Sequence, residues 1–277
     1  MNYKIVADSA SNVFEIQGVD YAVAPLKILC GEKEYTDLPG LDVSAMIDEM
    51  LSTKSAASTS CPNVSEWLEA FSGADCVFAV TITSNLSGSY NAAVTARDEY
   101  IKANPSARVH VFDTLSAGPE MRLIIEALTS LCENGMAFDE IVNEINNYMK
   151  KTHLLFCLES LTNLARAGRV HPAKAKLAGI LGIRVVGKAS DEGTLQELHK
   201  VRGAEKGISS VMSEMLSEGF DGGKVRIAHC RNEAAAEALK SVILAAFSQS
   251  DVQIEECAAL CSYYAEVGGL LIGYESK

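Results

Sequence analysis

The stretch CVFAVTITSNLSGSYNAA, residues 76–93, decides the fold class of this chain. Its first seven residues, 76–82, form a continuous apolar run that is typical of a strand buried on both faces. A hydroxyl-rich loop follows this strand, and the spacing of apolar residues beyond the loop predicts a helix from Ser89 to Lys102. The segment is therefore a strand, a loop and a helix, which is one half of a crossover unit in a parallel sheet.

The segments on either side of this unit repeat the same alternation. We predict strands at Tyr3–Ala7, Tyr21–Ile28 and Arg108–Phe112 and a helix at Pro119–Glu133. Asp42 is placed to cap a helix that begins at the next residue. Strands that alternate with helices favour a parallel sheet with helices on both faces.

The pattern changes after a predicted helix over 138–151. The second half begins with a strand at 153–158, short helical pieces over 160–179 and a hairpin with its turn at Asp191-Glu192-Gly193. Helices over 203–218 and 233–248 then alternate with strands over 225–230 and 252–260. We therefore predict an α/β protein with two domains, a parallel-sheet domain over 1–151 and a mixed-sheet domain over 152–277.

Composition excludes several classes of function. The chain of 277 residues carries a net charge of −12, which disfavours binding to nucleic acid or to anionic lipid surfaces. No apolar run is long enough to cross a bilayer and no signal peptide is visible, so we expect a cytoplasmic protein. The eight cysteines lack CxxC spacing, so we expect reduced thiols and neither disulfides nor a metal site.

Three loops rich in hydroxyl groups, at 58–62, 81–89 and 113–118, are the best candidates for a binding site. Each follows a predicted strand or precedes a helix, where free backbone N–H groups and the helix dipole favour an anion. Taken singly, each of these loops is better explained as a helix cap. Taken together they predict a site for a carboxylate or a phosphate.

Other candidate residues are open to more than one interpretation. Gly168 and Arg169 follow a short helix, so Arg169 either reaches a carboxylate with its guanidinium group or is simply solvated after a capping glycine. Asp37, Asp42 and Asp113 have either acid–base or capping roles. No phosphate-binding glycine loop and no GxSxG nucleophile motif is present in the sequence.

The ordered set of motifs resembles the DegV family, the fatty-acid-binding subunits of bacterial fatty acid kinase. The motifs that carry the resemblance span the chain: IVADSAS at 5–11, STSCPN at 58–63, TITSNLSGSYNAA at 81–93, VFDTLSAG at 111–118, LESLTNLARAGRV at 158–170 and HKVRGAEKG at 199–207.

The resemblance implies a fatty acid that lies in a tunnel between two α/β domains. It implies that Thr59 and Ser87, with Ser60 and Gly88 beside them, hold the carboxylate, and that Gly168 and Arg169 form the family's glycine–arginine element. It further implies no cofactor, and a separate ATP-binding kinase subunit as the partner that phosphorylates the bound acid. Apolar residues of 177–186 and 267–272 are candidates for the tunnel lining, although most of them are expected to be ordinary core.

The chain departs from the family pattern at the C-terminal end. The family commonly has a histidine in an H-T-G-P-G segment, and the corresponding residues 262–269 contain none. We expect Tyr264 to take that place and to donate a hydrogen bond through its hydroxyl. The alternative to a lipid carrier is an enzyme, a hydrolase or transferase acting on a small carboxylic or phosphorylated substrate. The missing nucleophile-activating base counts against this alternative.

Overall fold

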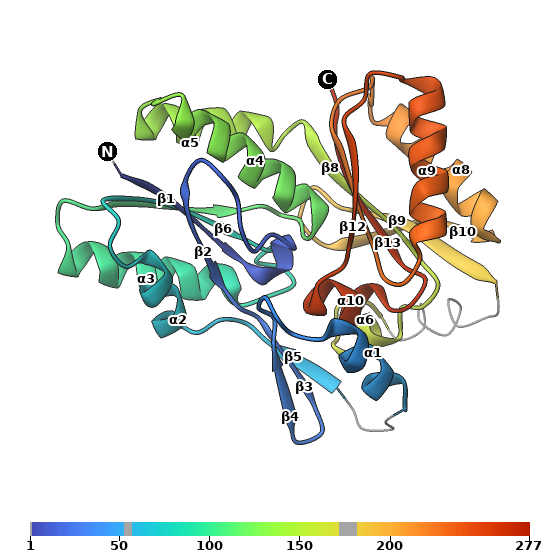
Figure 1. Ribbon diagram of the computed structural model, residues 1–277, viewed down its shortest axis with the longest axis horizontal. Helices are drawn as coiled ribbons and strands as arrows, with labels where there is room; N and C mark the ends of the chain where they lie inside the picture. Colours follow the sequence, from blue (N-terminus) through green and yellow to red (C-terminus); the bar gives the residue numbers. More distant parts are fainter. Residues whose placement is uncertain (1, 53–56, 172–181) are drawn as a thin grey trace.

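The first half of the chain is built on a four-stranded parallel sheet in the order β2-β1-β6-β7 (Figure 1). The structure is a computed structural model that describes residues 2–52, 57–171 and 182–277. The strands are β1 (Tyr3–Asp8), β2 (Asp20–Ala24), β6 (Cys76–Thr81) and β7 (Arg108–Asp113). Every residue of β6 is buried, as the continuous apolar run predicts.

Helices cover both faces of this sheet (Figure 1). Alternate strand residues point to opposite faces, so Val77 and Ala79 pack under α2 and α3 while Phe78 and Val80 pack under α4 and α5. The helices are α2 (Val64–Phe71), α3 (Ser89–Ala103), α4 (Pro119–Glu133) and α5 (Phe138–Tyr148).

The second half forms a six-stranded sheet in the order β10-β9-β8-β13-β11-β12. Only β11 and β12 pair in parallel, so the sheet is mixed, and the predicted α/β class is confirmed. Helices α8 (Ala204–Ser217) and α9 (Glu233–Ala246) cover one face. The strands are β8 (Thr152–Leu158), β9 (Ile183–Ala189), β10 (Leu195–Arg202), β11 (Val225–His229), β12 (Val252–Glu256) and β13 (Leu270–Glu275).

A third, smaller sheet corrects one prediction. The segment Tyr21–Ile28 is not one strand, because the chain leaves β2 after Ala24 and enters β3 (Lys27–Cys30) of a separate antiparallel sheet. Pro25 lies at the break and has no N–H to donate to either sheet. The order of this sheet is β4-β3-β5, with β4 at Lys33–Thr36, β5 at Ala57–Ser60 and helix α1 (Val43–Ser52) between them in the chain.

The predicted strand over 252–260 is also wrong in its second part. β12 ends at Glu256, and Ala259–Ala265 form helix α10. Asp37 accepts hydrogen bonds from the first two backbone N–H groups of this helix, at 2.9 and 3.1 Å. Of the short helical pieces expected over 160–179, α6 (Thr162–Arg166) is observed, and residues 172–179 lie outside the described residues.

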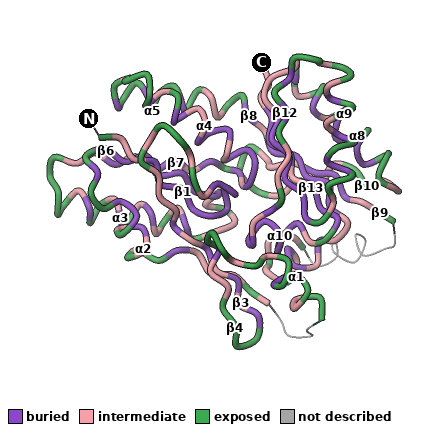
Figure 2. The backbone as a smooth tube through the Cα atoms, in the orientation of Figure 1, coloured by how far each residue is buried: buried purple, intermediate pink, exposed green. Residues whose placement is uncertain are grey.

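Helix α4 joins the two halves. It packs on the parallel sheet and also against β8, β11 and β13 of the second sheet, and its inner side is buried (Figure 2). The α4 side chains Arg122 and Glu126 form ion pairs with residues of β11 and β12. We call this group of charges the charged junction; it consists of Arg122, Glu126, Arg226, Asp251 and Glu255.

Candidate functional site

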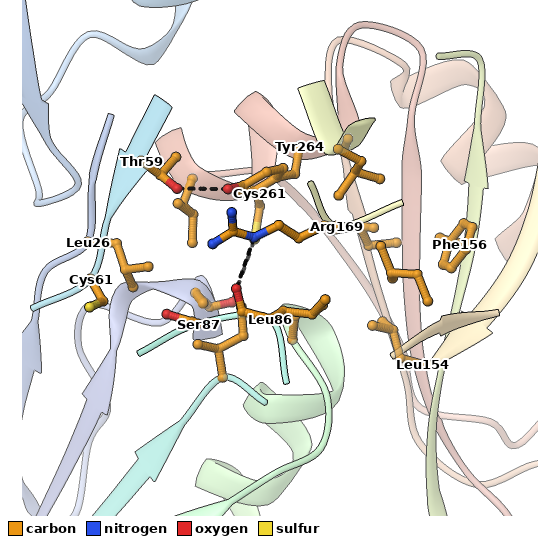
Figure 3. A pocket seen from close by; sticks show the side chains of 18 of the residues that line it. Leu26, Thr59, Cys61, Leu86, Ser87, Leu154, Phe156, Arg169, Cys261 and Tyr264 are labelled. Atoms are coloured by element: carbon orange, nitrogen blue, oxygen red, sulfur yellow. Dashed lines mark hydrogen bonds between the residues drawn. The ribbon is translucent and has the colours of Figure 1, made fainter. Parts of the chain in front are cut away.

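A cavity of ≈ 310 Å³ lies between the carboxyl edge of the parallel sheet, α10 and the second sheet. The six residues that the sequence nominates for ligand binding all line it, although they come from widely separated parts of the chain. They are Thr59, Ser60, Ser87, Gly88, Arg169 and Tyr264. Figure 3 shows Thr59 and Ser87 on one side of the cavity and the side chains of β8 on the other.

Thr59 lies on strand β5 of the small sheet, so the segment 57–60 is a strand and not the loop that the sequence suggests. Its Oγ1 forms a 2.7 Å hydrogen bond with the hydroxyl of Tyr264 on α10. Tyr264 therefore lies beside Thr59 at the polar end of the cavity. Both groups retain hydrogen-bonding capacity, since a hydroxyl has one proton and two lone pairs.

Arg169 provides the positive charge of the site. Its guanidinium lies between the Thr59–Tyr264 pair and Ser87 (Figure 3). Its Nε donates to the carbonyl of Leu86 at 3.0 Å, and its Nη1 donates to the carbonyl of Ala167. Arg169 thus reaches the first half of the chain, as one of its two interpretations predicts, but its partner there is the carbonyl of Leu86 and not a carboxylate.

At the polar end of the cavity, the described lining residues include no acidic group. Among these described residues, Arg169 is the one with a charged side chain. Its guanidinium forms no ion pair within the described parts of the chain. A cation at the end of a largely apolar cavity favours an anionic ligand, because burial strengthens the attraction of opposite charges.

The rest of the cavity is apolar. On β8, alternate residues Leu154, Phe156 and Leu158 face the cavity, and Leu155 and Cys157 face the core under α8 and α9. Further lining comes from the edge of the parallel sheet, β13 and α10: Ala10, Leu26, Ile82, Ala117, Leu260 and Leu271. The arrangement suits a ligand with a small anionic head and a long apolar tail.

The expected lining from 177–186 and 267–272 is found at a single residue of the described set. Leu271 lines the cavity, while Leu270 and Ile272 face the opposite core. Ile183 and Val185 do not line it, and residues 177–181 lie outside the described residues.

Most hydroxyls of the other loops serve the fold. Thr83 Oγ1 donates to the carbonyl of Gly193 in the second half at 2.9 Å, and Thr114 Oγ1 donates to the carbonyl of Thr81 at 2.8 Å. Ser116 Oγ donates to Glu120 on α4. Of the second loop, Ile82 and the consecutive residues Leu86, Ser87 and Gly88 reach the cavity, and Ala117 is the third loop's contribution.

Two buried aspartates hold the elements that carry the site: Asp8, and Asp37, which the sequence marks as a candidate for a capping or an acid–base role. Asp8 accepts hydrogen bonds from Ser89 Oγ at 2.6 Å and from the Ile82 N–H at 2.9 Å, and so fixes both ends of the loop that contains Ser87. Burial raises the pKa of Asp8 to about 7 and that of Asp37, the cap of α10, to about 6. The sequence signal for Asp8 was its position at the end of the first strand.

The eight cysteines are free thiols, and seven of them are buried. Cys61 and Cys261 line the cavity, which sequence reasoning did not anticipate. Within residues 2–52, 57–171 and 182–277, no group of three or more His, Cys, Asp or Glu side chains is arranged to hold a metal ion. The helices of the described part are all too short or too polar to cross a membrane.

Comparison with known proteins supports the resemblance seen in the sequence. The model of the DegV family, described as "uncharacterised protein, DegV family", matches residues 2–277. A DegV domain-containing protein of Streptococcus gordonii is 39% identical over 279 residues, covering 99% of both chains.

Two solved structures are similar to this chain over its length. A DegV family protein from Eubacterium eligens, loaded with heptadecanoic acid, has 41% identity and a TM-score of 0.97, covering 99% of this chain and 100% of that one. The fatty acid kinase B3 protein of Streptococcus pneumoniae, loaded with linoleic acid, has 38% identity and a TM-score of 0.98 with full coverage of both chains. The chain belongs to the DegV family.

Proposed function

We propose that this protein binds a long-chain fatty acid in the cavity between the halves 1–151 and 152–277. The observation that carries this proposal is the division of the cavity into one cationic, hydroxyl-lined end and a long apolar remainder. Relatives with nearly the same fold are loaded with heptadecanoic and linoleic acid, which have this division of polarity.

At the polar end, each group is assigned a role in holding the carboxylate. The hydroxyls of Thr59 and Ser87 donate to its oxygens, Tyr264 orients Thr59, and Arg169 supplies the compensating charge. Ser60 and Gly88 complete the rim of the site, where the absence of a side chain on Gly88 leaves room beside Cys61.

At the apolar end, the affinity comes from burial of the tail. Each methylene removed from water contributes about 0.8 kcal/mol. A few hydrogen bonds therefore suffice to orient the ligand, while the length of the buried tail dominates the binding free energy.

We assign the protein a binding role and not a catalytic one. It presents the acid, in the cytoplasm, to a separate ATP-binding kinase subunit that forms the acyl phosphate, as the likeness to the B3 protein of fatty acid kinase supports. The alternative of a hydrolase or transferase draws no support from the cavity. The lining residues that the structure describes include hydroxyls but no imidazole or carboxylate that would act as a general base on them.

The test is to extract the purified protein with organic solvent and to analyse the extract by mass spectrometry. A stoichiometric amount of long-chain fatty acid supports the proposal. A protein that is empty, and that takes up no fatty acid when it is supplied, rules the proposal out.

A double substitution, Thr59→Ala with Ser87→Ala, tests the assignment of the head group. It is expected to weaken retention of the acid while the unfolding transition stays cooperative, since both side chains are only partly buried. Unchanged lipid content in this variant would remove both hydroxyls from the carboxylate site.

A further inference from the structure

A second void lies behind the apolar wall of the cavity. It is small, ≈ 10 Å³, which is at the lower limit for a single water molecule. Three side chains line both spaces and so form the partition between them: Phe156, Leu164 and Leu195. The void is otherwise enclosed mainly by the apolar side chains of Leu161, Val170 and Val185.

Phe156 is the largest part of this partition. It is 3% exposed, and its neighbour on the adjacent strand is Gly187. A Cβ atom placed on Gly187 would lie 2.3 Å from Cζ and 2.6 Å from Cε2 of the Phe156 ring. The ring therefore fills the space that a side chain at 187 would need, and it lies across β9 between the cavity and the void.

The position of Phe156 in the cavity is at the end away from the polar groups. Figure 3 shows its ring on the side opposite Thr59 and Ser87, with Arg169 between them. A tail whose carboxylate is held at Thr59 and Ser87 runs toward this ring. We propose that Phe156 sets the length of acyl chain that the protein accepts, because its ring closes the void off from the end of the tail. This inference rests on the proposed binding of fatty acids.

The carboxylate of Glu197 limits how far an acyl chain could extend into the void. Glu197 lines the far side of the void, and its Oε1 pairs with Lys200 Nζ at 2.6 Å. Its Oε2 is buried and has no hydrogen-bond partner among the described residues. A methyl end cannot solvate this oxygen, so the extension admits a few carbons and then stops.

The experiment compares chain-length preference before and after the partition is opened. Wild-type protein and Phe156→Ala are freed of lipid and offered an equimolar mixture of straight-chain saturated fatty acids of graded length. The retained acids are then analysed by mass spectrometry. We expect the preferred chain in Phe156→Ala to be longer by about two carbons, with about fourfold stronger retention for each methylene that is newly buried.

Two further variants make the result specific. Phe156→Leu removes less side-chain volume than Phe156→Ala and is expected to shift the profile in the same direction by a smaller amount. Phe220→Ala is the matched control, because Phe220 is also 3% exposed but belongs to the core under α8 and α9. It is expected to lower thermal stability and to leave the profile of retained acids unchanged.

Each outcome decides the inference. A folded Phe156→Ala with the wild-type profile overturns it, and so does an equal shift in Phe220→Ala, which would indicate general loosening. If Phe156→Ala does not fold, Phe156→Leu gives the decision by the same criterion. If the wild-type protein itself retains none of the offered acids, the proposed function fails. A loaded wild-type protein with unshifted variants contradicts the role of Phe156 alone.

Discussion

Arg226 and Arg169 are both arginines at the contact between the two halves, and their surroundings differ. Arg226, in the charged junction, is 3% exposed and is paired with the carboxylates of Glu126 and Asp251 at 2.7 Å. Its remaining donors are used by Glu126 and by the carbonyls of Val225 and Asp251. Arg169 lines the cavity and donates to two carbonyls.

The comparison separates a structural charge from a functional one. The charge of Arg226 is neutralised within the fold, so no external group is needed there. The guanidinium of Arg169 has hydrogen-bond acceptors but no paired carboxylate among the residues that the structure describes, so we expect the neutralising carboxylate to come with the ligand. The following predictions test this distinction in order of decreasing effect.

Arg226→Met is expected to have the largest effect on stability. It removes one of the two arginines paired with the partly buried Glu126 carboxylate and leaves Arg122 as the other, which costs about 3 kcal/mol in the free energy of unfolding. Urea denaturation measures this loss. The double variant Arg226→Met with Glu126→Gln also removes the carboxylate that has lost one of its two partners, and it is expected to recover part of the lost stability. A single variant that is as stable as the wild type would show that the junction is not structural.

Arg169→Met is expected to affect binding and not stability. Loss of a charge-assisted hydrogen bond to the carboxylate weakens retention of fatty acid roughly 10- to 100-fold. Competition with a fluorescent fatty acid measures the change, and the urea midpoint is expected to stay near that of the wild type. Arg169→Lys retains the charge and is expected to fall between the two. Equal losses of stability in Arg169→Met and Arg226→Met would show that Arg169 is as structural as Arg226.

Glu120 is a third ionisable residue at the contact between the two halves, and unlike the two arginines it is a carboxyl group. It is 5% exposed, and its oxygens accept from Ser116 in the first half and Thr152 in the second. Burial raises its pKa from 4.5 to about 7. Between these values the native state holds one proton more than the unfolded state, so this group lowers stability as the pH rises from 4.5 to about 7.

Glu120→Gln removes this dependence. The amide keeps hydrogen bonds to both hydroxyls, since each hydroxyl can donate or accept. We expect the variant to gain of order 1–2 kcal/mol in the free energy of unfolding above pH 7 and little below pH 5. Urea denaturation across this pH range measures it. A pH profile parallel to that of the wild type would show that Glu120 does not titrate there.

Tyr264→Phe is expected to have the smallest effect. It removes the hydroxyl that orients Thr59 and costs about 1 kcal/mol, roughly fivefold in retention of fatty acid. Tyr263→Phe is the matched control on the same helix, because the Tyr263 hydroxyl donates to the Ala57 carbonyl and does not line the cavity. Retention measured by competition is expected to change in the first variant alone.

The parts of this fold that could be predicted from sequence are those specified locally. The strand at 76–81 was readable because both of its faces are buried, so its residues are apolar without interruption. The break between β2 and β3 was also marked locally, by Pro25, but the apolar residues around it masked the signal. β13 was missed because its short apolar run begins after two glycines and lacks a clear period.

The candidate site depends on contacts that the sequence does not reveal. Thr59 and Tyr264 are 205 positions apart, and the cap of α10 by Asp37 spans more than 220. Single loops predicted an anion site without its size or its apolar tail. The family pattern nominated the residues that line the cavity, whereas the role of Phe156 and the second void required the structure.

The position of β13 has a consequence for how the protein is made. This strand lies between β8 and β11, although both are synthesised well before it. The second sheet therefore cannot close on the ribosome until residues 270–275 have emerged, whereas the parallel sheet is complete in sequence by residue 113. Because Leu271 of β13 is part of the cavity wall, this wall is incomplete until β13 has paired with β8 and β11.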